Sequence, residues 1–433
     1  MCLEGTIEHM EDRTIWDVAV IGGGPSGMMA AGRAAELGAR TILLEKNSAL
    51  GKKLLITGGG RCNLTNADGD TREFLSKLKG NDKFLFSPFS QMDIQRTLSF
   101  FNTRGLKTKV EAEGRVFPVD DKARSVLETL VVYMKQGRVT VRTKCPVRRL
   151  VASEGNIKSI ECAEGISVYA KRVIISVGGM SYSETGSTGE GFDWLALLGH
   201  AIKKPNASLV PIAIHDTWVK KLQGVTVPDA KMNVMQDGKK RFTRKGRLLF
   251  THFGVSGPTV LNMSRDVRDL LPYGPVTIEL DLFPALDHGG MNEKLEKLFR
   301  KEGNKKFKNV AGVLVVGATF RKVIVGLSKI NPDKFCHSVT REERLKLVAI
   351  LKGVQMRVEG VLGKNKAIIT SGGVPLTEVD TKTMRSKLCG NLYLTGDVLD
   401  IDRPSGGYSL QLCWTTGYVA GTAAARSISS TEK

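Results

Sequence analysis

The sequence predicts an α/β fold built around a βαβ unit, together with at least one further domain. Residues 17–45 read as an apolar strand, a glycine turn, a helix and a second apolar strand. Residues 195–366 have a different pattern, with short segments in which apolar and polar residues alternate. From residue 367 the chain returns to buried strands that end in glycine turns. A chain of 433 residues is too long for one compact core, so two or three domains are expected.

The βαβ unit carries glycines where a dinucleotide needs them. Gly22 permits the tight turn out of the first strand, Gly24 lets the backbone approach a pyrophosphate, and Gly27 lets the helix pack against the strand. The helix, expected over 28–37, begins with free N–H groups and the positive end of its dipole. Glu45 ends the second strand, where an acid meets ribose hydroxyls. These elements in register favour a bound dinucleotide over a glycine turn without a ligand.

A glycine-rich loop follows, over residues 46–66. Its segment from Thr57 to Asn63, Thr-Gly-Gly-Gly-Arg-Cys-Asn, suits neither a helix nor a strand. It can form a backbone cradle whose donors point at an anion or a planar heterocycle. The alternative is a turn-rich surface loop.

The elements that complete the first part of the chain follow from apolar spacing and turn residues. They are helical segments over 72–105, a hairpin over 110–119, a helix over 122–136, a strand over 139–143, a hairpin over 157–170 and a buried strand over 172–177. This last strand runs into Gly178, and such a turn lets a strand end pass close to a bound nucleotide.

The middle section begins with short alternating strands between Asp-Gly and Gly-Pro turns, as in a small barrel or sandwich. Helices are expected over 291–300, 320–327 and 340–351. Thr340 is the expected N-cap of the last one, and Glu343 its capping-box partner.

The positive charge of the chain is concentrated in this middle section. Residues 195–366 contain 31 Lys and Arg against 15 Asp and Glu, which gives +16 of the total formal charge of +20. The excess could attract nucleic acid, an anionic substrate or a membrane surface. The alternative to such a binding surface is a solvated, highly charged face.

The last section contains expected strands over 367–374 and 392–398, and the second of these ends at Gly396 and Asp397. A helix opens at Tyr408 and runs to about residue 425. The pattern is again a strand, a glycine turn and a helix N-terminus that favours an electron-rich group.

Composition fits a soluble globular protein, with 41% apolar and 25% charged residues. No run approaches eighteen apolar residues, so no membrane span is expected. The loose lead-in over 1–16 is acidic and lacks an apolar block, which argues against a secretory signal. Seven scattered cysteines without a Cys-x-x-Cys pair predict reduced thiols and a cytoplasmic location, and we expect no metal site.

These residues give the chain a family resemblance. It resembles the bacterial and archaeal flavoproteins of the BaiN and aminoacetone oxidase-like family, also described as HI0933-like, within the glutathione-reductase-like FAD superfamily. The likeness runs from about Val18 to Gly421. Its five markers are Thr57 to Asn66, Gly114 to Pro118, Leu249 to Pro258, Thr370 to Val374, and Gly406 to Gln411. Asp397 and Ser409 depart from the family, whose members usually carry Glu and Asn at these positions.

The resemblance implies FAD on a discontinuous Rossmann-like domain made of residues 1–194 and 367–433. Residues 195–366 would be an insert with a β-barrel over about 195–288 and a small helical subdomain over about 289–352.

The resemblance also assigns parts of FAD to parts of the chain. Pyrophosphate is expected at the first glycine turn, ribose at Glu45, adenine near Val147, the ribityl chain at Gly396 and the flavin near Asn63 and the start of the last helix. The residues expected to bind FAD are Gly22, Gly24, Pro25, Ser26, Gly27, Glu45, Lys46, Lys53, Gly60, Arg61, Asn63, Val147, Gly178, Gly396, Asp397, Gly407, Tyr408, Leu410 and Gln411.

The expected activity is hydride transfer through flavin N5 to or from a small organic substrate, which could be anionic. It would be either NAD(P)H-linked reduction of a conjugated C=C bond or oxidation of an amine. No second Gly-x-Gly-x-x-Gly follows a middle strand, so NAD(P)H would visit the flavin transiently. An FAD-dependent RNA-modifying enzyme and a non-catalytic FAD-binding module stay open. The basic section favours RNA, whereas the lack of an aromatic stacking series argues against nucleic acid.

Five residues have two interpretations each. His252 is a candidate substrate-side acid or base, or a structural histidine. Cys62 is redox-active or, lacking a partner two residues away, a packing thiol. Lys53, Arg115 and Tyr408 bind an anionic substrate, or they form loop salt bridges and a packed ring.

Overall fold

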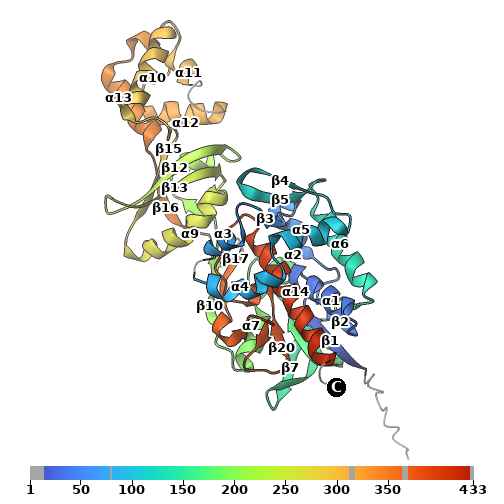
Figure 1. Ribbon diagram of the computed structural model, residues 1–433. Helices are drawn as coiled ribbons and strands as arrows, with labels where there is room; N and C mark the ends of the chain where they lie inside the picture. Colours follow the sequence, from blue (N-terminus) through green and yellow to red (C-terminus); the bar gives the residue numbers. More distant parts are fainter. Residues whose placement is uncertain (1–13, 79, 312–316, 363–368, 430–433) are drawn as a thin grey trace, which may run out of the picture. The chain divides into compact units, whose positions relative to one another are not determined.

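The structure is a computed structural model that describes residues 14–78, 80–311, 317–362 and 369–429 (Figure 1). Most of the expected lead-in, residues 1–13, and the expected boundary at 366/367 lie outside these residues. The chain divides into two compact units. The first consists of residues 1–207 and 369–433, and the second of residues 208–368.

A parallel sheet forms the centre of the first unit. Its strands lie in the order β20-β9-β1-β2-β6, and each neighbouring pair is parallel. The strands are β1 (Ile15–Ile21), β2 (Thr41–Leu44), β6 (Thr140–Arg142), β9 (Ser167–Ile175) and β20 (Leu392–Leu394). With helix α1 (Pro25–Glu36) between β1 and β2, the predicted βαβ unit and α/β class are confirmed. Buried apolar runs are typical of such parallel strands.

The predicted hairpin over 157–170 is confirmed as β8 (Asn156–Cys162) and the start of β9, but its second strand and the strand expected separately over 172–177 are one element, β9. The beginning of β9 pairs antiparallel with β8, and its end pairs in parallel with β1 and β20. No glycine or proline interrupts residues 167–175, so the chain passes from the β7–β8–β9 ribbon into the central sheet without a turn. Strand β7 (Val147–Ser153) forms the far side of that ribbon.

The last helix, α14 (Tyr408–Ser429), packs on α1, and Figure 1 shows the two side by side. The helices meet at glycines. A Cβ on Gly417 would lie 2.4 Å from the carbonyl oxygen of Ser26, and one on Gly421 would lie 2.4 Å from that of Ala30. Both ends of the chain therefore contribute to one apolar core.

The segments between β2 and β9 surround this core. The long loop expected over 46–66 contains helix α2 (Lys52–Ile56), a tight turn and strand β3, which corrects the expectation of no regular structure. Lysine and leucine, good helix formers, supply most of α2. The helical stretch 72–105 is three helices. The elements are α3 (Thr71–Ser76), α4 (Asp82–Gln91), α5 (Ile94–Thr103), α6 (Ala123–Gln136), and the small sheet of β3 (Thr65–Asn66), β4 (Thr108–Val110) and β5 (Arg115–Pro118).

The first unit is completed by the expected strand of residues 367–374, observed as β17, and by three short strands and one helix that the sequence did not predict. Strands β10 (Lys203–Ser208) and β17 (Ile369–Gly373) form a two-stranded sheet of their own, and β18 and β19 extend the central sheet beyond β20. These elements are α7 (Glu190–Leu197), β18 (Val379–Asp380) and β19 (Arg385–Ser386).

The second unit contains a closed barrel in the strand order β11-β14-β13-β12-β15-β16. Strand β16 pairs with β11 and closes it. The strands are β11 (Ile212–Ile214), β12 (Thr226–Gln236), β13 (Lys239–Phe250), β14 (Gly254–Ser256), β15 (Val276–Asp281) and β16 (Val354–Val361). Two helices, α8 (Thr217–Lys220) and α9 (Pro258–Leu270), accompany the barrel.

Helices fill the sequence between β15 and β16 and share one apolar core with the barrel. They are α10 (His288–Lys301), α11 (Phe307–Val310), α12 (Ala318–Ser328) and α13 (Arg341–Lys352). The predicted capping box of α13 is confirmed: the Glu343 N–H donates to Thr340 Oγ1 at 3.1 Å, and the Thr340 N–H donates to Glu343 Oε2 at 2.8 Å.

Across the four described ranges, every helix is too short or too polar to traverse a lipid bilayer. Nor do those ranges contain a group of three or more side chains suited to hold a metal ion.

Candidate functional site

The turn between β1 and α1 has room for a ligand at one glycine and none at two others. A Cβ on Gly22 would lie 2.6 Å from the Ser176 carbonyl oxygen, and one on Gly27 would lie 1.9 Å from that of Gly22. These two glycines therefore serve close packing. Among the described residues, apart from its chain neighbours, none has an atom within 4 Å of the Cβ position of Gly24, which is followed by Pro25 as the first residue of α1. An open backbone before a helix N-terminus suits a phosphate group.

Glu45 is buried and organises this turn. Its Oε2 accepts the Gly23 N–H at 2.7 Å, and its Oε1 accepts the backbone N–H and the side-chain Nδ2–H of Asn47 at 2.8 and 2.7 Å. A carboxylate has about four acceptor sites, so one is left for a ribose hydroxyl. The ammonium of Lys46 is engaged elsewhere, with Thr188 at 2.9 Å and Glu190 at 3.1 Å.

The glycine loop, residues 57–63, has an open side. Gly58, Gly59 and Gly60 adopt left-handed backbone angles, with φ of 57°, 69° and 86°. Leaving out chain neighbours, no atom of the part of the chain that the structure describes lies within 4 Å of the Cβ position of Gly59, and the nearest one at Gly60, the Leu55 carbonyl oxygen, is 3.9 Å away. The backbone here is therefore accessible to a flat ligand at close range.

Asn63 lies at the end of this loop with an unsatisfied buried acceptor. Its Oδ1 has no hydrogen-bond partner, which is true of only two buried side-chain polar atoms in the described residues. Leaving a buried acceptor unpaired costs about 1–3 kcal/mol. A ligand donor would remove that cost. The open glycines and this orphaned carbonyl fit a flavin, a planar ring system that carries hydrogen-bond donors.

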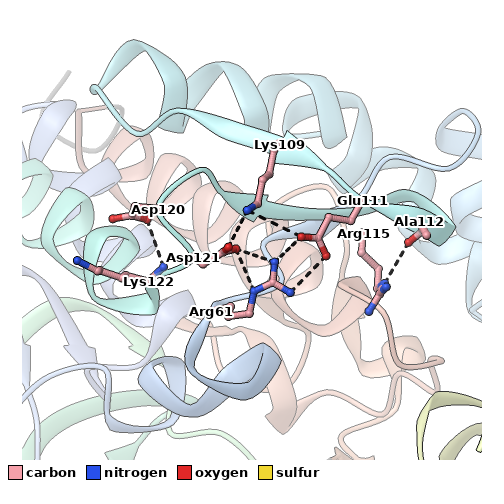
Figure 2. Close-up of polar contacts among 8 residues, drawn as sticks. All are labelled: Arg61, Lys109, Glu111, Ala112, Arg115, Asp120, Asp121 and Lys122. Atoms are coloured by element: carbon pink, nitrogen blue, oxygen red, sulfur yellow. Dashed lines mark hydrogen bonds and ion pairs between the residues drawn. The ribbon is translucent and has the colours of Figure 1, made fainter. Parts of the chain in front are cut away.

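The Arg61 side chain of this loop is bound by protein groups. Its guanidinium binds the carboxylates of Glu111 and Asp121 (Figure 2). It also lies over the Phe117 ring, 4.1 Å from the ring centre. Nearby, Arg115 donates to the Ala112 carbonyl at 3.1 Å.

Three further predicted positions border the first turn. Val147 begins β7, two residues after Cys145, whose N–H donates to the Glu45 carbonyl at 3.0 Å. The Cβ position of Gly178 is 3.8 Å from Lys53 Nζ. That ammonium donates to Ser181 Oγ at 3.1 Å, and burial lowers the pKa of Lys53.

The Gly396 turn meets the start of α1. Its Cβ position lies 2.8 Å from Ser26 Oγ, and its N–H donates to Thr416 Oγ1 at 3.0 Å. The Asp397 carboxylate pairs with Arg403, which also donates to Ser409 Oγ at 2.9 Å. The structure therefore brings this C-terminal turn and the first glycine turn together.

The start of α14 meets the strand that follows the glycine loop. A Cβ on Gly407 would lie 2.3 Å from the Thr65 carbonyl oxygen. Tyr408 and Leu410 are buried, and the Tyr408 ring stacks on Phe74 at 4.5 Å, which favours the packed-ring interpretation. The Gln411 amide is satisfied inside the protein, so a contact from this helix would come from its free N–H groups.

His252 belongs to a different compact unit from these residues. It belongs to the second unit, follows β13, is exposed, and has its ring edge-on to Phe253 at 4.7 Å. Cys62 is fully buried, and burial raises the pKa of its thiol to about 12. A thiol that stays protonated at neutral pH is a poor nucleophile, which favours the packing interpretation.

Sequence reasoning missed several residues that shape the site. Gly23 and Asn47 hold Glu45, and Ser176 limits the space at Gly22. The short spacing between Glu45 and Asn47 could have indicated their contact. The role of Ser176 depends on a parallel strand far away in sequence, and no local signal could have found it.

The chain matches known proteins along nearly all its length. The family described as HI0933-like protein Rossmann domain matches residues 16–423. The 3-dehydro-bile acid delta(4,6)-reductase of Clostridium scindens is 31% identical over 415 residues, which are 94% of this chain and 98% of that protein. The ribosomal RNA dihydrouridine synthase of Escherichia coli is 26% identical over 408 residues, which are 93% of this chain and 96% of that protein.

A solved structure shares the fold. The 3-ketosteroid delta1-dehydrogenase from Sterolibacterium denitrificans aligns with a TM-score of 0.56 at 12% identity, covering 95% of this chain and 100% of that one. The likeness at this identity concerns architecture. The family match extends over both halves of the described site, from the first glycine turn to the start of α14. The chain therefore belongs to the HI0933-like Rossmann-domain family and is an FAD-dependent oxidoreductase.

Proposed function

We propose that this protein uses FAD to reduce a carbon–carbon double bond conjugated with a carbonyl group, with NAD(P)H as a transient electron donor. The observation that carries the cofactor's position is the buried, unpartnered Oδ1 of Asn63 beside the open backbone of Gly59 and Gly60. Bound flavin supplies hydride transfer through N5.

The residues of the first unit have distinct roles in this proposal. The open backbone at Gly24 and the first turn of α1 hold the pyrophosphate, and the remaining acceptor site of Glu45 takes a ribose hydroxyl. The first turn of α14 directs its positive dipole end to the flavin pyrimidine, where negative charge accumulates on reduction.

The names of two relatives support reduction over amine oxidation. A delta(4,6)-reductase and a dihydrouridine synthase, by the chemistry in their names, each add hydrogen across a carbon–carbon double bond. Reduction of a carbon–carbon double bond is thus common to both relatives by name, although their two substrates differ greatly in size.

A uracil base in RNA is the second candidate substrate, and strand β13 favours it. Six of the nine residues from 239 to 247 are exposed cations: Lys239, Lys240, Arg241, Arg244, Lys245 and Arg247. Three of them pair with nearby acids, Arg241 with Asp237 at 3.3 Å, Arg244 with Asp266 at 2.8 Å and Lys245 with Asp229 at 3.9 Å. A cationic strip of this kind suits a phosphate backbone.

Two measurements test the proposal in sequence. Anaerobic titration of the FAD-loaded protein with NADH and NADPH should bleach the flavin. The reduced protein should then be reoxidised by a conjugated enone or by uridine-containing RNA, with loss of the corresponding double bond by mass spectrometry. Reoxidation by amine-derived imines alone would contradict the reductase assignment. RNA turnover that falls steeply between 50 and 200 mM salt would select the second candidate, as expected for phosphate contacts.

A further inference from the structure

The glycine loop has little internal structure to hold its shape. Gly58, Gly59, Gly60 and Cys62 all have positive φ. Inside the loop, the backbone N–H groups of Arg61 and Cys62 both donate to the Thr57 carbonyl, that of Cys62 at 2.9 Å. A segment with many left-handed residues loses much conformational entropy on ordering, so contacts outside the loop must fix it.

Arg61 provides such contacts on the hairpin of β4 and β5. Its Nε and Nη2 donate to Asp121 Oδ1 at 2.9 and 2.6 Å, and its Nη1 donates to Glu111 at 3.3 Å, with a further short bond from Nη2 to Glu111. Lys109 joins the cluster through Asp121 at 2.7 Å (Figure 2). The acids lie 50 and 60 residues away in the sequence. The loop is therefore tied to a distant element.

Phe117 connects the Arg61 side chain to the glycines. The guanidinium carbon lies 4.1 Å from the centre of this buried ring. The Cβ position of Gly58 lies 3.2 Å from the same ring and 2.8 Å from the Asn63 backbone nitrogen. The ring that Arg61 covers therefore borders Gly58, where a side chain would collide with the Asn63 backbone nitrogen and crowd the Phe117 ring.

The guanidinium is committed to protein carboxylates. Four hydrogen bonds from its five N–H groups go to Glu111 and Asp121. Arg61 holds the pKa of Glu111 below its usual value, and Lys109 with Arg61 does the same for Asp121, so both partners are charged at neutral pH. Little of the fork is left to bind an anionic group of a ligand.

We propose that Arg61 is a positioning residue: its ion pairs with Glu111 and Asp121 hold the glycine loop in the shape that presents Asn63 and the Gly59–Gly60 backbone to FAD. The proposal rests on the FAD site described above. It excludes direct contact between the Arg61 side chain and the flavin. The two roles can be distinguished, because they predict different FAD affinities when Glu111 and Asp121 are changed.

A double-mutant cycle separates the two roles. The variants are Arg61→Gln, the pair Glu111→Gln with Asp121→Asn, and all three changes together, with FAD affinity of the apoprotein measured by fluorescence quenching. Positioning predicts that the arginine variant and the acid variant each raise the Kd for FAD about tenfold or more, and that combining them adds little further loss. Direct contact predicts that the acid variant, which frees the guanidinium, binds FAD as well as the wild type or better, and this result would overturn the proposal.

A readout on the apoprotein guards against a general folding defect. Hydrogen exchange should rise in residues 57–63 of both variants, with the thermal midpoint of the apoprotein within a few degrees of wild type. The absorption bands of bound FAD should shift in the same direction in both. Unchanged exchange in the loop would also contradict the proposal.

Arg124→Gln is the matched control. Arg124 forms an exposed ion pair with Glu128 at 3.2 Å on α6 and does not touch the loop. Its Kd for FAD should stay within twofold of wild type. A wild-type protein that takes up no FAD would end both proposals, whereas FAD-bound wild type with an unaffected acid variant would end only this one.

Discussion

Thr65 and Gln411 meet in the interior of the first unit although 346 residues separate them, with Thr65 Oγ1 donating to Gln411 Oε1 at 2.7 Å. The Gln411 Nε2 donates to Thr97 and Thr415 at 2.8 and 3.0 Å. This fully buried amide links the strand after the glycine loop, helix α5 and helix α14. The two chain ends are thus held together by polar contacts as well as by apolar packing.

Gln411→Ala should destabilise the protein by about 2–4 kcal/mol, because it leaves a cavity and buried threonine hydroxyls without partners. Urea unfolding measures the change. Gln91→Ala is the control, since Gln91 makes one surface bond to the Lys382 carbonyl at 2.9 Å. It should cost about 1 kcal/mol or less. Equal effects of the two changes would contradict this account of the interior.

Gly417→Ala should also destabilise the protein, by about 1–3 kcal/mol, because its new methyl group would lie 2.4 Å from the Ser26 carbonyl oxygen. Gly326→Ala makes the same change in α12, where no atom lies within 4 Å. It should stabilise the protein by about 0.5–1 kcal/mol. Thermal and urea unfolding should show a lower free energy of unfolding for Gly417→Ala and a higher one for Gly326→Ala.

Asn63→Ala should weaken FAD binding and leave the apoprotein as stable as before or slightly more so. The reason is that Asn63 Oδ1 is buried without a partner in the protein, so its removal relieves a cost in the absence of ligand. The FAD dissociation constant should rise about tenfold, as expected for loss of one hydrogen bond to a ligand. A loss of apoprotein stability with unchanged FAD affinity would show that Asn63 is structural.

Cys62 should make stability fall at alkaline pH. Burial raises the pKa of its folded-state thiol from an ordinary 9.0 to about 12. Below pH 9 both states hold the proton and Cys62 contributes no pH dependence. Between pH 9 and about 12 only the unfolded chain loses the proton. The free energy of unfolding therefore falls by about 1.4 kcal/mol per pH unit from this group.

Urea unfolding of wild type and Cys62→Ala at pH 8, 9, 10 and 11 tests this pH dependence. The curve of the variant should be less steep above pH 9, with a constant offset below it from the small cavity. Parallel curves over the whole range would contradict a buried, protonated thiol.

His252→Gln separates the two interpretations of that residue. Because His252 is exposed and its ring contacts the neighbouring Phe253 ring, the substitution should leave the unfolding midpoint unchanged. If His252 donates a proton to the substrate, the substitution should lower kcat about 10²-fold or more with little change in FAD affinity. His337→Gln, at another exposed histidine of the second unit, is the control. Equal kcat in both variants would assign His252 no catalytic role.

Local signals in the sequence were sufficient for part of this structure. The βαβ unit and the Thr340–Glu343 capping box depend on residues a few positions apart, and both are confirmed. The close packing at Gly27 also follows from its place in a short pattern.

Features that depend on distant partners could not be predicted. The acids that bind Arg61 and the hydroxyls around Gln411 come from other elements, and a single sequence does not reveal such pairings. Strand β9 was divided in error because its pattern changes where its neighbours change, from the β8 ribbon to the central sheet. The sequence predicts Glu45 as a ribose ligand, and this stays a prediction, whereas its bonds to Gly23 and Asn47 came only from the fold.

The order of strands in the central sheet has a consequence for biosynthesis. While the ribosome is still translating the second unit, β9 has an uncovered edge that β20 will occupy, and α1 has a bare face that α14 will cover. Until β20 and α14 have been synthesised, this partly folded chain exposes an unpaired strand edge and an apolar helix face, which promote aggregation. A chaperone that shields such edges, or slow folding of residues 14–207 on their own, would decide the yield of the protein in the cell.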